Sequence, residues 1–131
     1  MARILVIEDS PTNMRLSVDV LESAGHTVLQ ASRANDGIEI AKRERLDLIL
    51  MDIQLPDMDG LTATRLLKAD PHTQKVPIVA VTASAMKGDR ERILQAGCDG
   101  YIEKPIRYKF FLSEVASITK SPPPQPEPGN D

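Results

Sequence analysis

Five side chains able to do polar chemistry stand at the ends of separate apolar runs in this sequence. Glu8 and Asp9 follow the first run, Asp52 the third and Thr82 the fourth, and Lys104 lies just beyond the fifth. If these runs are parallel strands of one sheet, their carboxyl ends share an edge, where ligands bind in open α/β sheets. Carboxylates are the hard oxygen ligands that suit Mg²⁺, and hydroxyl and ammonium groups bind phosphoryl oxygens. The pattern therefore predicts one small site for Mg²⁺ and a phosphoryl group.

Asp52 is the side chain best placed to react. It follows residues 48–51, a run with no polar residue that reads as a strand buried on both faces. A carboxylate held there can attack a phosphoryl group and form an acyl phosphate. Such a reaction needs little beyond positioning and neutralisation of the three equatorial oxygens, to which Mg²⁺, Lys104 and Thr82 could each contribute. No cluster of cysteine and histidine is present, which argues against zinc.

The elements that must position these groups follow from the alternation of apolar runs with amphipathic stretches, which occurs five times. This alternation predicts an α/β fold with a parallel sheet, and right-handed crossovers place helices on both of its faces. The expected strands are residues 3–7, 27–31, 48–51, 78–81 and 100–103. The expected helices run to about residue 24, from about 35 to 45, around Leu61 to Leu67, around Ile93 up to Gly97, and over 106–119.

Composition places the chain among ordinary globular domains. Its 131 residues suffice for one domain, and no apolar run approaches the roughly 18 residues of a membrane span. A net charge of −3 with interspersed signs gives no basic footprint for nucleic acid. The lone cysteine, Cys98, cannot form an internal disulfide, which suits a reducing cytosol. We therefore expect a cytoplasmic protein that binds neither nucleic acid nor membrane.

The last eleven residues, 121–131, include five prolines. Such a segment can neither continue a helix nor build a core, so we expect a disordered tail after a domain that spans 1–120. A solvated end or linker and a docking motif for a proline-reading domain are both compatible with this composition.

Four motifs of the chain resemble the receiver domain of two-component response regulators, the CheY-like family. They are residues 6–9 (VIED), 51–60 (MDIQLPDMDG), 81–83 (VTA) and 104–105 (KP), and the likeness covers about residues 2–119. Residues 96–101 (AGCDGY) are also similar to single-domain cell-division regulators of the DivK type. The resemblance implies a flavodoxin-like (βα)5 three-layer sandwich with a five-stranded parallel sheet of order 2-1-3-4-5.

For the reaction, the resemblance implies that Asp52 accepts a phosphoryl group from a histidine kinase or a histidine phosphotransfer protein. It implies Mg²⁺ bound by Asp9, Asp52 and the backbone carbonyl of Gln54, with Glu8 assisting through water. A protein of this kind catalyses only its own phosphorylation and dephosphorylation, so it is not an enzyme in the usual sense. The sequence does not identify its cognate kinase.

For the response, the resemblance implies that Thr82 is the switch hydroxyl and Lys104 the phosphate-binding lysine, with a cis bond before Pro105. It implies that Tyr101 turns inward as Thr82 moves toward the phosphoryl group. The surface over residues 84–111, which holds all four aromatic side chains, would then contact a downstream protein. Homodimerisation through the last helices and strands stays open.

Alternative functions make different demands on the sequence. An aspartate-nucleophile phosphatase wants a second acid two residues after the nucleophile, where this chain has Gln54. A flavin-binding protein of the same fold wants a phosphate loop rich in small residues after the first strand, whereas this chain has the acidic pair Glu8 and Asp9. Two alternatives remain: an unphosphorylated receiver that acts as a scaffold, and the receiver part of a larger regulator.

Overall fold

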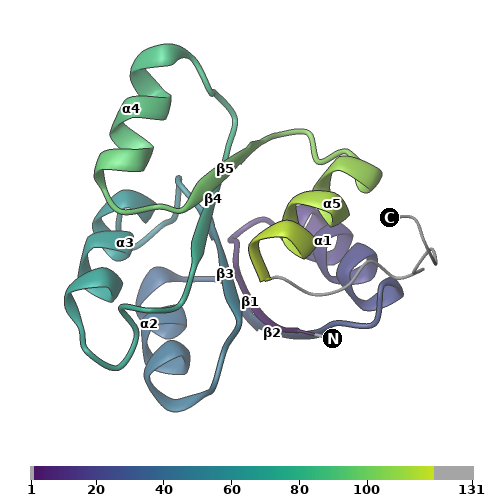
Figure 1. Ribbon diagram of the computed structural model, residues 1–131, viewed down its shortest axis with the longest axis horizontal. Coiled ribbons are helices and arrows are strands. Elements are labelled where there is room, and N and C mark those ends of the chain that lie inside the picture. The colour runs from purple at the N-terminus through teal and green to yellow at the C-terminus, as the bar shows by residue number, and fades with distance from the viewer. Residues whose placement is uncertain (1, 120–131) are drawn as a thin grey trace.

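A computed structural model describes residues 2–119 of the chain, so the tail expected over 121–131 lies outside the described residues. Within them, five parallel strands form one sheet in the order β2-β1-β3-β4-β5, which confirms the predicted topology (Figure 1). The strands are β1 (Arg3–Ile7), β2 (Thr27–Ala31), β3 (Leu48–Asp52), β4 (Ile78–Thr82) and β5 (Gly100–Glu103). Each agrees with its predicted bounds to within one residue.

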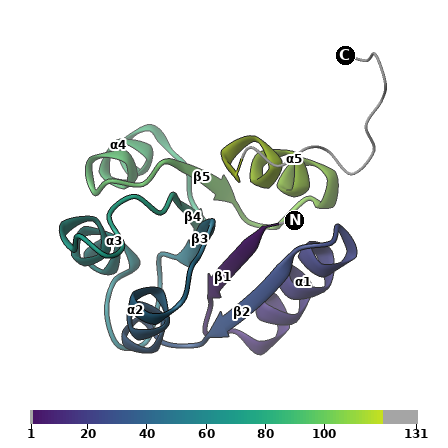
Figure 2. The same cartoon turned by 60° about the horizontal axis from the view of Figure 1, so that its bottom comes forward.

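Five helices cover the two faces of this sheet and make a three-layer sandwich. They are α1 (Pro11–Ser23), α2 (Ala34–Arg43), α3 (Gly60–Ala69), α4 (Lys87–Gln95) and α5 (Tyr108–Thr119). Helices α1 and α5 lie together on one face, and α2, α3 and α4 cover the other (Figures 1 and 2). This division is the one that right-handed crossovers impose on the observed strand order.

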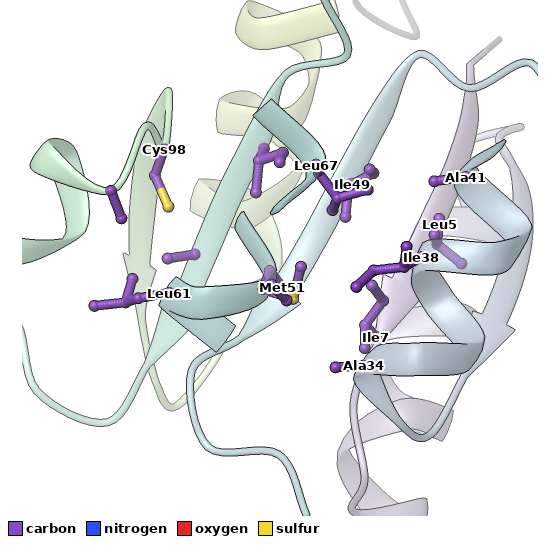
Figure 3. Packing of buried hydrophobic residues seen from close by; sticks show 14 of the residues in the cluster. Leu5, Ile7, Ala34, Ile38, Ala41, Ile49, Met51, Leu61, Leu67 and Cys98 are labelled. Atoms are coloured by element: carbon purple, nitrogen blue, oxygen red, sulfur yellow. The ribbon is translucent and has the colours of Figure 1, made fainter. Parts of the chain in front are cut away.

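The side chains divide into two cores because neighbouring residues of a strand point to opposite faces. Leu5, Ile49 and Met51 face α2 and α3 and pack with Ile38 and Leu67 (Figure 3). The other core lies beneath α1 and α5 and is built from alternate residues of the same strands with the buried faces of these helices: Ile4, Val6, Leu48, Leu50, Val18, Leu21, Phe111 and Val115. All five residues of β3 and of β4 are buried, as expected for central parallel strands.

The strand register brings the functional ends of the strands to one level. Ile7 pairs with Met51, Asp52 with Val81, and Thr82 with Glu103. The residue after β1, the last residue of β3 and the last residue of β4 therefore emerge side by side at the carboxyl edge of the sheet. The convergence expected from the sequence follows from this register.

The helices differ most in how much apolar surface they bury. Helix α4 buries only Ile93 among its nine residues, and Leu94 beside it is 51% exposed. On α5 the adjacent rings separate as the helical period requires, with Phe111 fully buried and Phe110 52% exposed. Helix α5 begins at Tyr108, two residues later than expected. In the described part of the chain, no helix is long and apolar enough to cross a membrane.

Candidate functional site

The acidic pair after β1 is held by the turn into α1. The Glu8 amide donates to the Ala31 carbonyl at 3.0 Å and so extends the pairing with β2. Ser10 caps α1 by accepting a hydrogen bond from the Asn13 amide, and its own amide donates to Glu8 Oε2 at 3.1 Å. The Glu8 side chain is buried, whereas Asp9 is exposed. The two carboxylates thus differ in environment although they are adjacent in sequence.

Burial raises the pKa of the Glu8 carboxyl above its usual value. The Ser10 amide opposes this shift, and the nearby Asp52 carboxylate adds to it. A cation placed between these carboxylates would relieve their repulsion and favour the ionised form of Glu8.

Asp52 ends the central strand β3 and is also buried. Its Oδ1 accepts a hydrogen bond from the Gln54 amide at 3.1 Å. The loop that follows is closed by hydrogen bonds from the Ile53 amide to the Val81 carbonyl and from the Gly60 amide to the Ile53 carbonyl. Gly60 lies so close to the end of β3 that a Cβ at this position would meet the Asp52 carbonyl oxygen. The Asp52 carboxylate thus stands at the end of a strand whose following loop is closed by backbone hydrogen bonds.

Lys104, the residue after β5, extends its side chain toward the carboxylates of Glu8 and Asp52. Its amide donates to the Thr82 carbonyl at 2.7 Å, which continues the pairing of β4 and β5. Its Nζ lies 3.4 Å from Asp52 Oδ2 and 3.6 Å from Glu8 Oε1. The bond between Lys104 and Pro105 is cis, as the resemblance implied. The only buried acids of the described residues thus share one ammonium group.

The three carboxylates at the carboxyl ends of β1 and β3 could hold a metal ion. Glu8, Asp9 and Asp52 each offer an oxygen, and these oxygens lie within 4.8 Å of one another. An all-oxygen donor set with two or more carboxylates suits Mg²⁺, so the residues present fit the metal that the sequence predicted.

The Thr82 hydroxyl is hydrogen-bonded to the loop that follows β4. Its hydroxyl donates to the Ser84 carbonyl at 2.9 Å and accepts from the Ser84 amide at 3.1 Å. The Ser84 hydroxyl in turn donates to Asp89 Oδ2 at 2.6 Å, and Arg92 of α4 donates to the other oxygen of Asp89. This chain of contacts from Thr82 to α4 was not predicted, because sequence spacing does not reveal which polar partners a loop brings together.

A cavity of about 180 Å³ lies between these groups. Asp52, Thr82 and Lys104 line it from the carboxyl edge of the sheet, and Ser84 and Arg92 line it from the side of α4. The cavity gives the Asp52 carboxylate an open space beside Thr82 and Lys104.

Tyr101 lies outside this cavity. The nearby Tyr101 side chain raises the pKa of the Arg90 guanidinium on α4. It lines a second, larger recess of about 510 Å³ with Lys104, Pro105 and Phe110. The expected switch aromatic therefore lines a different recess from Thr82, and α4 is linked to Thr82 through Ser84.

Comparison with known proteins identifies the family of this chain. Residues 4–116 match the response regulator receiver domain. Since the match spans most of the chain, the protein belongs to the response regulator receiver domain family of two-component signalling. Proteins of this family interact with histidine kinases or phosphotransfer proteins and with downstream targets.

Within the family, the chain is 43% identical over 114 residues to the polar-differentiation response regulator DivK of Brucella anthropi, covering 87% of this chain and 93% of that one. The DivK protein of Brucella ovis is 42% identical over the same length and coverage. Among solved structures, the receiver domain of a sensor histidine kinase from Pseudomonas aeruginosa is 38% identical, with a TM-score of 0.85 over 92% of this chain and 98% of that one. That structure has a magnesium ion coordinated in its active site cleft.

Proposed function

We propose that this protein is a phosphorelay receiver in which Asp52 accepts a phosphoryl group from the phosphohistidine of a sensor kinase or phosphotransfer protein. The observation that carries the proposal is the position of Asp52: it is buried at the end of the central strand, 3.4 Å from the Lys104 ammonium, and within 4.8 Å of two further carboxylates. A nucleophile, a cation for the developing charge and a set of metal ligands are thereby assembled in one place.

In the transfer step, an oxygen of Asp52 attacks the phosphorus atom, a P–O bond forms, and the P–N bond to the donor imidazole breaks. The electron pair of that bond leaves with the imidazole nitrogen. Lys104 neutralises one phosphoryl oxygen, and Thr82 is placed to donate to another once its hydroxyl leaves the Ser84 carbonyl. Asp9, Asp52 and the backbone carbonyl of Gln54 would hold Mg²⁺, with Glu8 acting through water. When bound, the metal supplies charge neutralisation at the remaining oxygen.

The response would be a shift of population between two arrangements of the α4 side of the molecule. A phosphoryl group on Asp52 favours the arrangement in which Thr82 donates to it, and Tyr101 then turns inward. The recess of about 510 Å³ beside Phe110 lies within residues 84–111, and it is the surface we assign to a downstream protein. Exposed Met86 and Tyr108 extend this surface. We assign the protein to the cytoplasm, where kinase domains of such systems operate.

The proposal is tested by intact mass after incubation with Mg²⁺ and acetyl phosphate, beside a sample without metal and the Asp52→Asn variant. We expect a single adduct of one phosphoryl group in the wild type and none in either control. The absence of an adduct from acetyl phosphate and from a loaded phosphotransfer protein would instead favour an unphosphorylated scaffold.

Residues 1–120 are proposed to act as one receiver domain. A folded product of this length after limited proteolysis, still phosphorylated at Asp52, would support that assignment of the domain and of the tail that follows it.

A further inference from the structure

The loop between β3 and α3 is tied to the start of α2 by the carboxylate of Asp57. Its Oδ1 accepts a hydrogen bond from the Ala34 amide and its Oδ2 accepts one from the Asn35 amide, both at 2.8 Å. Helix α2 begins at Ala34, and the residue in its N-cap position, Arg33, makes no side-chain cap. Asp57 therefore satisfies from another loop the amides that a capping side chain of the helix itself normally satisfies.

The same loop carries groups of the phosphoacceptor site. It follows Asp52 directly, and its Gln54 amide donates to Asp52 Oδ1. The Gln54 carbonyl is the backbone ligand that the proposed function assigns to Mg²⁺. At its other end the loop is closed by the hydrogen bond between Gly60 and Ile53. Between these closed ends, the Asp57 carboxylate supplies the hydrogen bonds that join the segment to α2.

We propose that Asp57 is a positioning residue of the phosphoacceptor site: by bonding Ala34 and Asn35 it fixes the loop 53–59 against α2 and so holds the Gln54 carbonyl at the metal position. This inference rests on the proposed function, because the metal site is itself proposed there. Two oxygens bound to two consecutive amides allow the carboxylate only one orientation. A charged acceptor at the positive end of a helix also makes a stronger bond than a neutral one.

The carboxylate keeps its charge over the range in which a receiver would work. The Asn35 amide, and with it the Ala34 amide, holds the pKa of Asp57 below its usual value. Partly buried Leu55 and Met58 pack against the core on either side of it, so the loop has apolar contacts as well. These contacts set the general path of the loop, and Asp57 sets its distance from α2.

A purely structural role for Asp57 makes a different prediction, since it would act on α2 alone. The variant Asp57→Ala removes both the cap of α2 and the attachment of the loop. The double variant with Arg33→Asp gives α2 a capping side chain of its own but leaves the loop unattached. Asp36→Ala is the matched control, because Asp36 is an exposed acid in the first turn of the same helix.

The test measures Mg²⁺ affinity by NMR, from the shifts of the Asp52 and Gln54 amides, and stability by urea unfolding without metal. We expect Asp57→Ala to lower the unfolding midpoint. It should also raise the Kd for Mg²⁺ about tenfold, because the loop that carries the Gln54 carbonyl loses its attachment to α2 and so the outer support of a metal ligand. The double variant should recover the midpoint but not the affinity. The Asp36→Ala control should keep the affinity of the wild type.

Recovery of both quantities in the double variant, or an unchanged Kd in Asp57→Ala, would overturn the inference and leave Asp57 as a cap only. If Asp57→Ala does not fold, Asp57→Asn serves in its place, because it keeps one accepting oxygen and should give an intermediate Kd. A wild type that binds no Mg²⁺ would overturn the proposed function and this inference with it. If the wild type and every variant bind Mg²⁺ with the same Kd, the inference about Asp57 is overturned and the proposed function stands.

Discussion

Replacement of Gly60 by alanine should destabilise the protein although alanine is the better helix former. Gly60 is the first residue of α3, and a Cβ there would lie 2.3 Å from the Asp52 carbonyl oxygen and 2.8 Å from the Ile53 Cα. Both neighbours are backbone atoms, so the clash can be relieved only by moving the end of β3 or the start of α3. The glycine is required here by close approach of two backbone segments.

The size of the effect follows from two opposing contributions. Replacing glycine by alanine where the backbone allows it stabilises by about 0.4–1 kcal/mol. Overpacking a filled site costs about 1–3 kcal/mol, and a backbone neighbour places this site at the upper end. We therefore expect a net loss of about 2 kcal/mol, which lowers Tm by roughly 8 °C in a domain of this size.

Two other glycines provide matched controls. A Cβ at Gly88, in the first turn of α4, meets nothing within 4 Å, so Gly88→Ala should raise Tm slightly. The three atoms nearest a Cβ at Gly37 all belong to the side chain of Ile7, which can change its rotamer at some cost. Thermal unfolding followed by circular dichroism should rank the variants Gly88→Ala, Gly37→Ala and Gly60→Ala in order of falling Tm.

The three glycine variants also separate an effect on stability from an effect on phosphorylation. Because the displaced atom in Gly60→Ala belongs to Asp52, phosphorylation by acetyl phosphate should slow by up to about a hundredfold in this variant, and much less in the other two. A Gly60→Ala protein that melts within 1 °C of Gly88→Ala would refute the reasoning from close approach.

Three further predictions concern the metal, a histidine and the cysteine. Mg²⁺ at a hundred times its Kd should stabilise the wild type by about 2.7 kcal/mol in urea unfolding, and an Asp52→Asn variant that gains as much would contradict the assigned ligands. His26 Nδ1 accepts the Ala2 amide at 3.1 Å, and burial lowers its pKa. Protonation therefore favours the unfolded chain, so stability should fall as pH drops below about 6.5, and less steeply in His26→Gln. Burial raises the pKa of the Cys98 thiol, so alkylation should follow unfolding, and rapid labelling of the folded protein would contradict its burial.

Much of the fold could be predicted because its signals are local. The apolar runs of β3 and β4 are continuous, since both faces of these strands are covered, and Gly25 and Gly97 end their helices with φ of 91° and 108°. The site could be predicted for the same reason. Its residues stand at strand ends, and a parallel sheet brings all such ends to one edge.

What the sequence did not reveal depends on tertiary placement. The partners of Asp57 lie more than 20 residues away on α2, and no spacing rule connects them. The bond from Ser84 to Asp89 depends on how the β4–α4 loop folds back on the helix. Leu66 and Leu94 lie in helices that the sequence predicted, yet both are about half exposed. A short helix offers too few turns to decide which apolar residues face the core.

The small buried face of α4 has a consequence for the way a signal could spread. Opening β3 locally would expose five buried residues, whereas releasing α4 from the sheet exposes one buried side chain, that of Ile93. Local free energies of opening follow the apolar surface exposed, so amide hydrogens of α4 should exchange with solvent long before those of the strands. The helix that bonds Ser84 through Asp89 and carries Arg90 near Tyr101 is thus the described helix with the fewest buried side chains to hold it on the sheet.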